Sequence, residues 1–238
     1  EDDAKAGAMT RSAPKVERTA DVRKVARVLV EGGTKVAPVF RGEELWGIIT
    51  EDAILEAVIE NLDALTIEQI YTEDVITVEE DTNVGQIVNL LRKHSISRLP
   101  VLDDTEGLTG MVTRHDIVDV VVRDMNKATR GDRSGEIERV LDMPVYDIMN
   151  SPVETADPSD SVRDAVERML EHDFAGLVVT DDVDHVIGIV TKTDVLRALT
   201  YTEEDHMDVQ ITNISLLDTI SRADIREDIS SVADKYQA

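Results

Sequence analysis

The heptapeptide Gly110-Met111-Val112-Thr113-Arg114-His115-Asp116 decides the fold of this chain, because the chain repeats it. The segment 188–194 keeps the same order: a Gly, two apolar residues, a Thr, and an Asp three residues after the Thr. The segment 47–53 matches it as far as Thr50 but ends on Ala53. Working upstream, the copies also match at Val22, Val84 and Val162, and at Met9, Tyr71 and Met149. Three copies of one unit of roughly 50 to 60 residues therefore make up most of the chain.

Each unit changes its periodicity in the same order. Apolar residues at i, i+3, i+4 and i+7 predict helices that begin at Val22, Val84 and Val162, with Asp21, Asn83 and Ser161 as N-caps. Two short β-branched runs follow in each copy, at 36–40 and 45–50, at 98–102 and 108–113, and at 177–180 and 186–191. Second helices are predicted at 52–61, 116–125 and 194–201. The unit is strand, helix, strand, strand, helix, which predicts an α/β (α+β) fold.

This order of elements, with Arg98-Leu99-Pro100-Val101 and the two complete Gly-to-Asp segments, resembles the cystathionine-β-synthase (CBS) domain. The resemblance covers about residues 9 to 202. It implies copies that pair sheet against sheet into Bateman modules with two clefts, which bind AMP, ADP, ATP or S-adenosylmethionine as regulatory ligands. The expected boundaries are 1–66, 67–127 and 145–202 for the repeats, 128–144 for a charged connector, and 203–238 for a tail.

A Thr at the end of a strand, followed three residues later by an Asp at the start of a helix, can bind a nucleoside phosphate, and this holds independently of the family resemblance. The Asp accepts two hydrogen bonds from a ribose diol, while the Thr hydroxyl and the first free N–H groups of the helix face a phosphate. Thr113 with Asp116, and Thr191 with Asp194, are therefore candidates for binding a nucleoside phosphate. The competing interpretation is that each pair only caps its helix.

The copies differ at this candidate site. In the first copy Asp52 comes one residue early and points about 100° away on a helix, so Thr50 and Asp52 are weaker candidates. Arg98 stands where CBS domains of the γ subunit of AMP-activated kinase carry a phosphate-contacting base, and Arg can hold phosphate bidentately. The third copy has Gly176 at this place, which leaves room for an adenine, and takes its basic group from Lys192 or from another copy.

The resemblance adds candidates on the strands. Thr77 and Thr155 occupy matching first-strand positions where the family often contacts its ligand, and Lys15 stands there in the first copy; a β-branched residue that fills a strand is the alternative. An apolar adenine wall is expected near Val78, Leu99 and Leu177. The candidate binding residues are Thr77, Val78, Arg98, Leu99, Pro100, Thr113, Arg114, His115, Asp116, Thr155, Gly176, Leu177, Thr191, Lys192 and Asp194, with Lys15, Thr50 and Asp52 as weaker members.

Composition excludes several classes of function. The formal charge is −25, from 25 basic and 50 acidic residues, which disfavours DNA, RNA or anionic lipid as a partner. Only 8 of the basic residues are Lys, and this combination fits a cytoplasm of molar salt and predicts a halophilic archaeal source. The chain has no Cys, hence no disulfide, thiolate metal site or Cys nucleophile. With no membrane span or signal peptide in the sequence, the expected location is the cytoplasm.

Three copies leave two pairing schemes open. If the first copy pairs with the second, the sheet of the third needs a partner from another subunit. If the second pairs with the third through the long connection between Thr113 and Met149, both complete motifs share one module. The fragment-like start at Glu1 favours the second scheme, with a lost upstream copy beside the first. Both schemes permit a homodimer.

The tail departs from the repeat. Residues 207–214 alternate like a strand, and 218–236 have helical spacing. Their order resembles the opening of ribosome hibernation-promoting factor domains, which implies a truncated domain and a possible association with ribosomes. The alternative is a helix that packs on the last module or on a second subunit.

The sequence thus predicts a non-catalytic regulatory protein in which an adenine nucleotide shifts the assembly of the repeats or of an attached domain. A ligand-free dimerisation or interaction scaffold is the alternative. An enzyme is the third choice, since no catalytic constellation is visible. No metal site is predicted either, because His185 and its neighbouring Asp residues are typical of a turn.

Overall fold

The computed structural model describes residues 13–127 and 133–201. The chain divides into two units, 1–200 and 201–238, and the description concerns the first. The strand and helix predicted for the tail lie outside the described residues.

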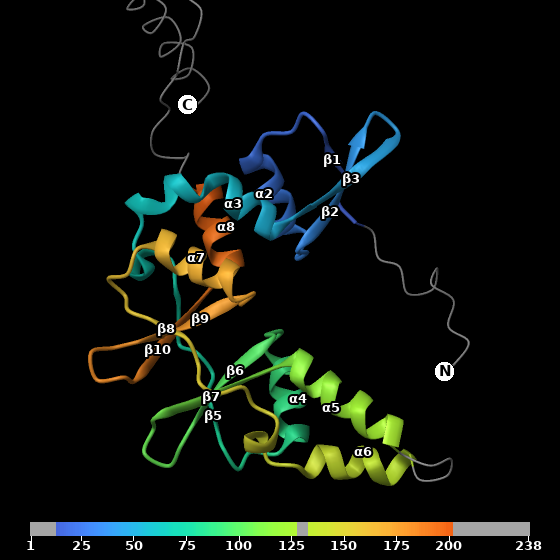
Figure 1. The fold of residues 1–238 in the computed structure, drawn as a ribbon, viewed down its shortest axis with the longest axis vertical. Coiled ribbons are helices and arrows are strands. Elements are labelled where there is room, and N and C mark those ends of the chain that lie inside the picture. The colour runs from blue at the N-terminus through green and yellow to red at the C-terminus, as the bar shows by residue number, and fades with distance from the viewer. Residues whose placement is uncertain (1–12, 128–132, 202–238) are drawn as a thin grey trace, which may run out of the picture. The chain divides into compact units, whose positions relative to one another are not determined.

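The described residues form three repeats of the predicted unit (Figure 1). The first repeat contains β1 (Val16–Glu17), α2 (Val22–Glu31), β2 (Val36–Arg41), β3 (Glu44–Thr50) and α3 (Glu51–Val58). The second contains β5 (Val78–Glu79), α4 (Val84–Lys93), β6 (Arg98–Leu102), β7 (Leu108–Thr113) and α5 (Arg114–Lys127). The third contains β8 (Thr155–Ala156), α7 (Val162–Glu171), β9 (Gly176–Thr180), β10 (Val186–Thr191) and α8 (Lys192–Tyr201).

Leading segments precede the second and third repeats. The segment before the second repeat holds the 3-10 turns η1 (Ile59–Ala64) and η2 (Ile67–Gln69) and the strand β4 (Thr72–Glu73). The segment before the third repeat holds α6 (Arg133–Asp142) and η3 (Val145–Asp147). The predicted charged connector thus contains the whole of α6, whose Val140 is buried in the core of the second repeat.

The predicted capping of the first helices is confirmed. The side chain of Asp21 accepts from the Arg23 N–H at 2.7 Å, and that of Asn83 accepts from the Gln86 N–H at 2.9 Å. In the third repeat Ser161 caps α7 in the same way. Apart from Val22, which is exposed at the start of α2, the apolar stripe that follows each cap is buried or half-buried, so the helices form where capping and periodicity agree.

Each repeat builds a small mixed sheet. Its first strand runs parallel to the second, and the second pairs antiparallel with the third, in the order β1-β2-β3 or β5-β6-β7. The register places the Thr of each motif opposite the start of the middle strand: Thr50 opposite Val36, Thr113 opposite Arg98, and Thr191 opposite Gly176. The motif Thr therefore always lies at the same end of its sheet, where the next helix begins.

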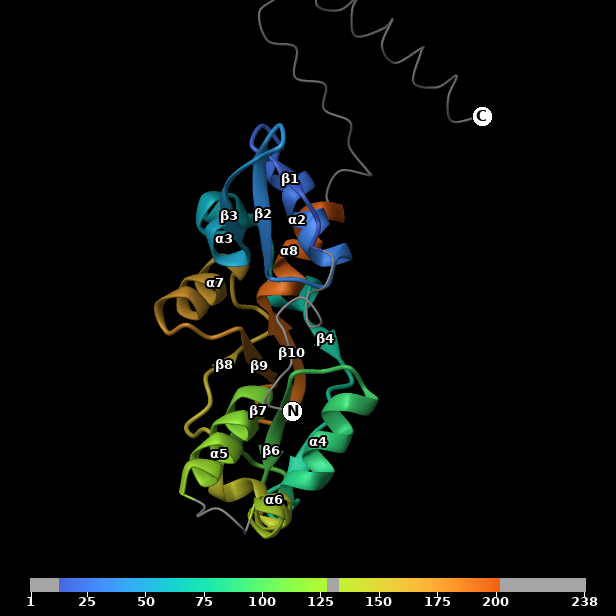
Figure 2. The same ribbon diagram turned by 90° about the vertical axis from the view of Figure 1, so that its right-hand side faces the viewer.

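The second and third repeats exchange their leading segments. The strand β4, which leads into the second repeat, pairs with β10 of the third, with Thr72 opposite Ile189. In return Asn150, which leads into the third repeat, bridges Met111 on β7 through two backbone hydrogen bonds of 2.9 and 3.0 Å. Figures 1 and 2 both show the strands β8–β10 beside β5–β7. This is the scheme that pairs the second copy with the third.

Two glycines make the exchange possible. A Cβ atom at Gly110 would overlap the side chain of Met149, and one at Gly188 would overlap the ring of Tyr71. Met149 and Tyr71 are equivalent residues of the two leading segments. The Gly of the repeated motif is thus required by the close approach of a side chain from the other repeat.

Gly110→Val is expected to lower the free energy of unfolding by about 1 to 3 kcal/mol, because the added atoms overpack the contact with Met149. Chemical denaturation measures the loss. Combining Gly110→Val with Met149→Ala makes room for the new valine side chain. The double variant should therefore lose less stability than the sum of the losses of the two single variants. Simple additivity would show that Met149 does not cover Gly110.

The first repeat packs on the third through helices. One core joins Val25 and Leu29 of α2 and Ile54 of α3 with Val166 and Met169 of α7. Leu62 of η1 and Leu196 of α8 belong to the same core. The second repeat has a separate core, which it shares with α6 and η3. The helices of the first repeat are therefore covered, and Val16 of β1 and Ala37 of β2 also belong to this core.

Candidate functional site

Both complete motifs close the same hydrogen-bonded ring. Asp116 Oδ2 accepts from the Thr113 N–H and hydroxyl, both at 2.7 Å. Asp194 Oδ2 accepts from the Thr191 N–H at 3.0 Å and its hydroxyl at 2.6 Å. One oxygen of each carboxylate therefore caps the strand end. In the first repeat Thr50 accepts from the Ala53 N–H at 3.2 Å, which leaves a cap without a carboxylate.

The second oxygen of each carboxylate also has a partner. Asn150 donates to Asp116 Oδ1 at 2.8 Å, and Arg197 donates to Asp194 Oδ1 at 2.8 Å. Asn150 and the side chain of Arg197 are exposed. A ligand hydroxyl that reaches Oδ1 would replace or share these exposed partners, while the cap through Oδ2 stays in place.

Two cavities adjoin these carboxylates, and each is built from both the second and the third repeat. The cavity beside Asp194, here called the Asp194 cleft, has a volume of about 510 Å³. Its lining comes from β4 and the segment after it, from the start of β6, and from the motif of the third repeat. The lining residues are Thr72, Asp74, Val75, Ile76, His94, Ser95, Ile96, Ser97, Arg98, Ile189, Thr191, Thr193, Asp194 and Arg197.

The cavity beside Asp116, here called the Asp116 cleft, has a volume of about 490 Å³. In this cleft the second and third repeats exchange the parts that they contribute to the Asp194 cleft. It combines the motif and middle-strand start of the second repeat with the leading segment and middle-strand start of the third, and Lys35 of the first repeat also lines it. Its lining residues are Lys35, Ser97, Arg98, Met111, Thr113, Arg114, His115, Asp116, Asn150, Pro152, Val153, Glu154, Asp173, Phe174, Ala175 and Gly176. The two clefts are thus equivalent sites, and each forms only when the two repeats pair.

Arg98 lines both clefts. Burial lowers the pKa of its guanidinium, while the charges of Glu51 and Asp194 raise it. A Cβ atom at Gly176 would lie 2.9 Å from Arg98 Nη1. The space beside Gly176, where the sequence predicts an adenine, is therefore occupied by the guanidinium of Arg98.

Lys192 has a different role from the predicted one. Its side chain is 4% exposed, and its Nζ lies 2.7 Å from Asp52 Oδ1. It lines neither cleft. Lys192 and Asp52 form an ion pair between the third and first repeats, so the predicted phosphate base of the third copy is committed to the interface between repeats. In the first repeat a second pair, Lys35 Nζ to Glu51 Oε1, also measures 2.7 Å.

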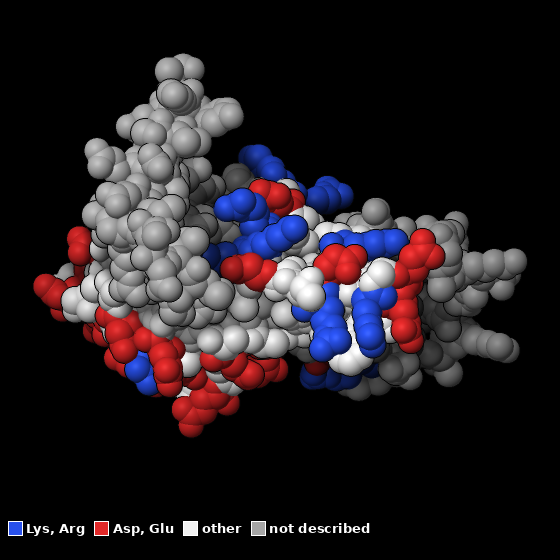
Figure 3. Space-filling model, turned by 90° about the horizontal axis from the view of Figure 1, so that it is seen from above, with Lys and Arg blue, Asp and Glu red and all other residues white. Residues whose placement is uncertain are grey.

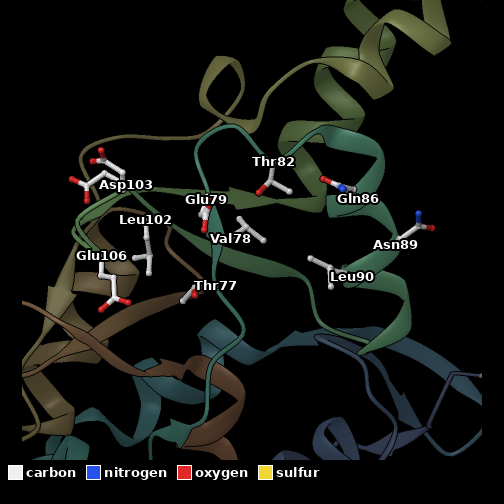
Figure 4. Close-up of a pocket in the computed structure, with 11 residues that line it drawn as sticks. Thr77, Val78, Glu79, Thr82, Gln86, Asn89, Leu90, Leu102, Asp103 and Glu106 are labelled. Carbon is white, nitrogen blue, oxygen red and sulfur yellow. The ribbon is translucent and has the colours of Figure 1, made fainter.

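The strand threonines lie outside both clefts. Thr77 and Val78 line a pocket of about 720 Å³ with Glu79, Asp103 and Glu106 (Figure 4). Carboxylates in that pocket oppose binding of a phosphate. Thr155 lines another pocket, of about 690 Å³, beside the turn that carries His185. Lys15 lies over the ring of Phe40, with its Nζ 5.1 Å from the ring centroid.

The structure brings other residues to the clefts instead. Val75 and Ile76 line the Asp194 cleft, and Val153 and Glu154 line the Asp116 cleft. They stand at equivalent positions of the two copies, one or two residues before Thr77 and Thr155. The matching positions of these residues in the two copies are the feature of the sequence from which their place in the clefts could have been predicted. Three predicted apolar residues are buried and are not among the lining residues of either cleft: Leu99, Pro100 and Leu177.

Each cleft balances basic side chains against carboxylates, in a chain whose formal charge is −25. The Asp116 cleft is lined by Lys35, Arg98 and Arg114 and by Asp116, Glu154 and Asp173, and the Asp194 cleft by Arg98 and Arg197 and by Asp74 and Asp194. Figure 3 shows Lys and Arg side chains grouped on one face of the described residues, with Asp and Glu side chains beside them. The first repeat carries the exposed basic residues Lys15, Arg18, Arg23, Lys24, Arg27, Lys35 and Arg41. Cationic groups near the clefts suit an anionic ligand.

Two further properties concern the described residues. Across 13–127 and 133–201, no three His, Asp or Glu side chains come together as a metal site. Within the same ranges no helix is long and apolar enough to cross a membrane.

Comparisons with known proteins identify the family to which the three repeats are similar. The model of the CBS domain matches residues 4–60, 67–123 and 145–201. MJ1404, an uncharacterised protein of Methanocaldococcus jannaschii, is 33% identical over 172 residues; the match covers 71% of this chain and 41% of that protein. This chain thus spans about two fifths of the length of that relative.

Two solved structures share the fold. An uncharacterised conserved protein from Pyrococcus horikoshii superposes with a TM-score of 0.65 at 25% identity, over 80% of each chain. MJ1225 of Methanocaldococcus jannaschii superposes with a TM-score of 0.69 at 22% identity, over 79% of this chain and 67% of that one. The α/β fold of tandem units paired in modules is therefore shared with these proteins.

Proposed function

This chain belongs to the CBS-domain family, and from that premise we propose that it is a non-catalytic regulatory protein that binds AMP, ADP, ATP or S-adenosylmethionine. One observation carries the proposal. The Asp194 and Asp116 clefts are equivalent cavities, and each contains a carboxylate, apolar residues and the guanidinium of Arg98. In each cleft a ligand could replace the exposed side chain, Arg197 or Asn150, that donates to the carboxylate.

The lining of the Asp194 cleft supplies a complementary group for each part of such a ligand. Asp194 Oδ1 can accept from the ribose hydroxyls in place of Arg197. Ile76, Ile96 and Ile189 offer an apolar wall for an adenine. Arg98 provides a bidentate donor for a phosphate. These groups come from two repeats, so a bound nucleotide would bridge them.

The Asp116 cleft has the same parts in another arrangement. Asp116 Oδ1 is held by Asn150, and Val153 and Phe174 provide the apolar surface. Arg114 and Arg98 supply the positive charge. The proposed role of His115, beside the motif, is to face a phosphate.

Regulation would follow from the position of the clefts. A ligand that prefers one arrangement of the second and third repeats shifts the chain toward it by its difference in affinity. The first repeat contacts the third through its core and through Lys192, so the shift would reach the first repeat as well. We propose a cytoplasmic homodimer as the assembly that responds.

Isothermal titration with AMP, ADP, ATP and S-adenosylmethionine in molar potassium chloride tests the proposal. Asp194→Ala and Asp116→Ala should each weaken binding at their own cleft by about 1 to 3 kcal/mol, through lost hydrogen bonds to the ribose. Asp119→Ala, a change of an exposed carboxylate on α5 away from both clefts, is the matched control and should leave the titration unchanged. Saturable binding that survives both cleft variants together would contradict the assignment of the sites.

A ligand-free scaffold is the second candidate. The observation in its favour is that both oxygens of Asp116 and of Asp194 already have protein partners. The absence of heat with all four compounds, from protein with an intact circular dichroism spectrum, would support it. A nucleotide hydrolysis assay separates both candidates from an enzyme, whose turnover would disappear in the Asp116→Ala and Asp194→Ala variants.

A further inference from the structure

The sheet of the first repeat has an open edge. Its strand order is β1-β2-β3, and no described strand pairs with the outer side of β3. No described atom lies within 4 Å of a Cβ placed at Gly47. On the same strand Leu45, Trp46 and Ile48 are 61%, 59% and 71% exposed. An unpaired strand with exposed apolar side chains is a template for another chain segment.

The other two repeats show what occupies this edge. Gly188 and Gly110 are equivalent to Gly47, and they are covered by Tyr71 and Met149. The next residue of each leading segment then pairs with the strand: Thr72 lies opposite Ile189, and Asn150 lies opposite Met111. Both times the edge is covered by the segment that leads into a different repeat, never by the repeat's own leading segment.

The chain contains a third leading segment of the same kind. Met9 and Thr10 precede Tyr71 and Thr72 by the same interval that separates Val22 from Val84. They belong to residues 1–12, outside the described part of the chain. The edges of β7 and β10 are already covered by the other leading segments. Among the third strands of the three repeats, β3 alone has an open edge in the described residues, and it belongs to the same repeat as Met9, so a second molecule offers the matching surface in trans.

We propose that two copies of this chain exchange residues 1–12. Met9 of each chain covers Gly47 of the partner subunit, and Thr10 pairs with Ile48 of the partner subunit. The interface is self-complementary, because each molecule gives one leading segment and receives one, as a two-fold dimer requires. The inference specifies the surface of the homodimer proposed above. It does not depend on nucleotide binding, since neither cleft contains a residue of β3.

Sedimentation velocity of the 238-residue chain is the first test, in dilute and in molar potassium chloride. The expected mass is about twice 26.4 kDa. Gly47→Val should weaken the dimer at least about tenfold, because its side chain enters open space in one molecule but fills the space that Met9 needs. Val183→Glu, at a 66% exposed residue of the third repeat, is the control and should leave the dimer intact. A wild-type monomer at all concentrations would overturn the inference.

Cysteine cross-linking identifies the contact, because the chain has no Cys of its own. Mixed chains that carry Thr10→Cys or Ile48→Cys should form a disulfide-linked dimer under mild oxidation, whereas Thr10→Cys mixed with Val183→Cys should not. A double variant that closes a disulfide within one chain would overturn the exchange. Nucleotide titration of Gly47→Val should match the wild type, so failure of the dimer and failure of the proposed function give different results.

Discussion

Asp52→Ala is expected to lower the free energy of unfolding by about 3 kcal/mol. The variant leaves the ammonium of Lys192, 4% exposed, without the carboxylate 2.7 Å away. An uncompensated buried charge is far costlier than a lost surface pair. The estimate is at the lower end for a buried pair because the Asp52 side chain is 41% exposed, so solvent screens part of the interaction. Guanidinium denaturation measures the loss.

Two further variants distinguish this cause from a general weakening of the interface. Adding Lys192→Met removes the stranded charge, so the double variant should recover more than half of the loss. Asp63→Ala breaks the ion pair between Asp63 Oδ2 and Arg163 Nη1, 3.0 Å apart, which also joins the segment after α3 to the third repeat but is exposed. Its cost should stay below about 1 kcal/mol. Equal losses for Asp52→Ala and Asp63→Ala would contradict the buried-pair argument.

The role of Lys192 shows what a repeat alignment leaves out. The alignment compares equivalent positions of different copies, and it correctly placed Lys192 beside the motif Thr. The partner of Lys192 is Asp52, which lies one residue away from its expected place in another copy. Nothing local in the sequence relates the two side chains, since only the packing of the first repeat on the third brings them together.

The elements themselves were predictable because local physics fixes them. Helical periodicity with Asn83 and Ser161 as caps placed α4 and α7, and paired β-branched runs placed the long strands. The two-residue strands β5 and β8 offer no alternation from which a side chain's direction can be derived. The placement of Thr77 and Thr155 at the ligand therefore depends on the family resemblance alone, and both residues line pockets away from the two clefts.

Arg98→Met should weaken binding of AMP at both clefts by about 1.5 to 3 kcal/mol, which is about 10- to 100-fold, and leave adenosine nearly unchanged. The reason is that Arg98 lines both cavities and is their shared bidentate donor for a phosphate. Met keeps apolar bulk beside Gly176 while it removes the charge. Parallel titrations with AMP and adenosine give the comparison, and an equal loss for both ligands would show that Arg98 supports the fold of the cleft rather than the phosphate.

Arg114→Met is the matched variant, because of the two clefts Arg114 lines only the one beside Asp116, where its Nη2 donates to the Leu91 carbonyl at 3.5 Å. It should weaken one of two binding events, whereas Arg98→Met weakens both. The two titrations together therefore test the geometry as well as the charge. A single guanidinium at the junction of both cavities also means that a phosphate in one cleft competes for Arg98 with a phosphate in the other. Negative cooperativity between the two events should then appear with AMP, disappear with adenosine, and be lost in Arg98→Met; independent sites in the wild type would place Arg98 in one cleft only.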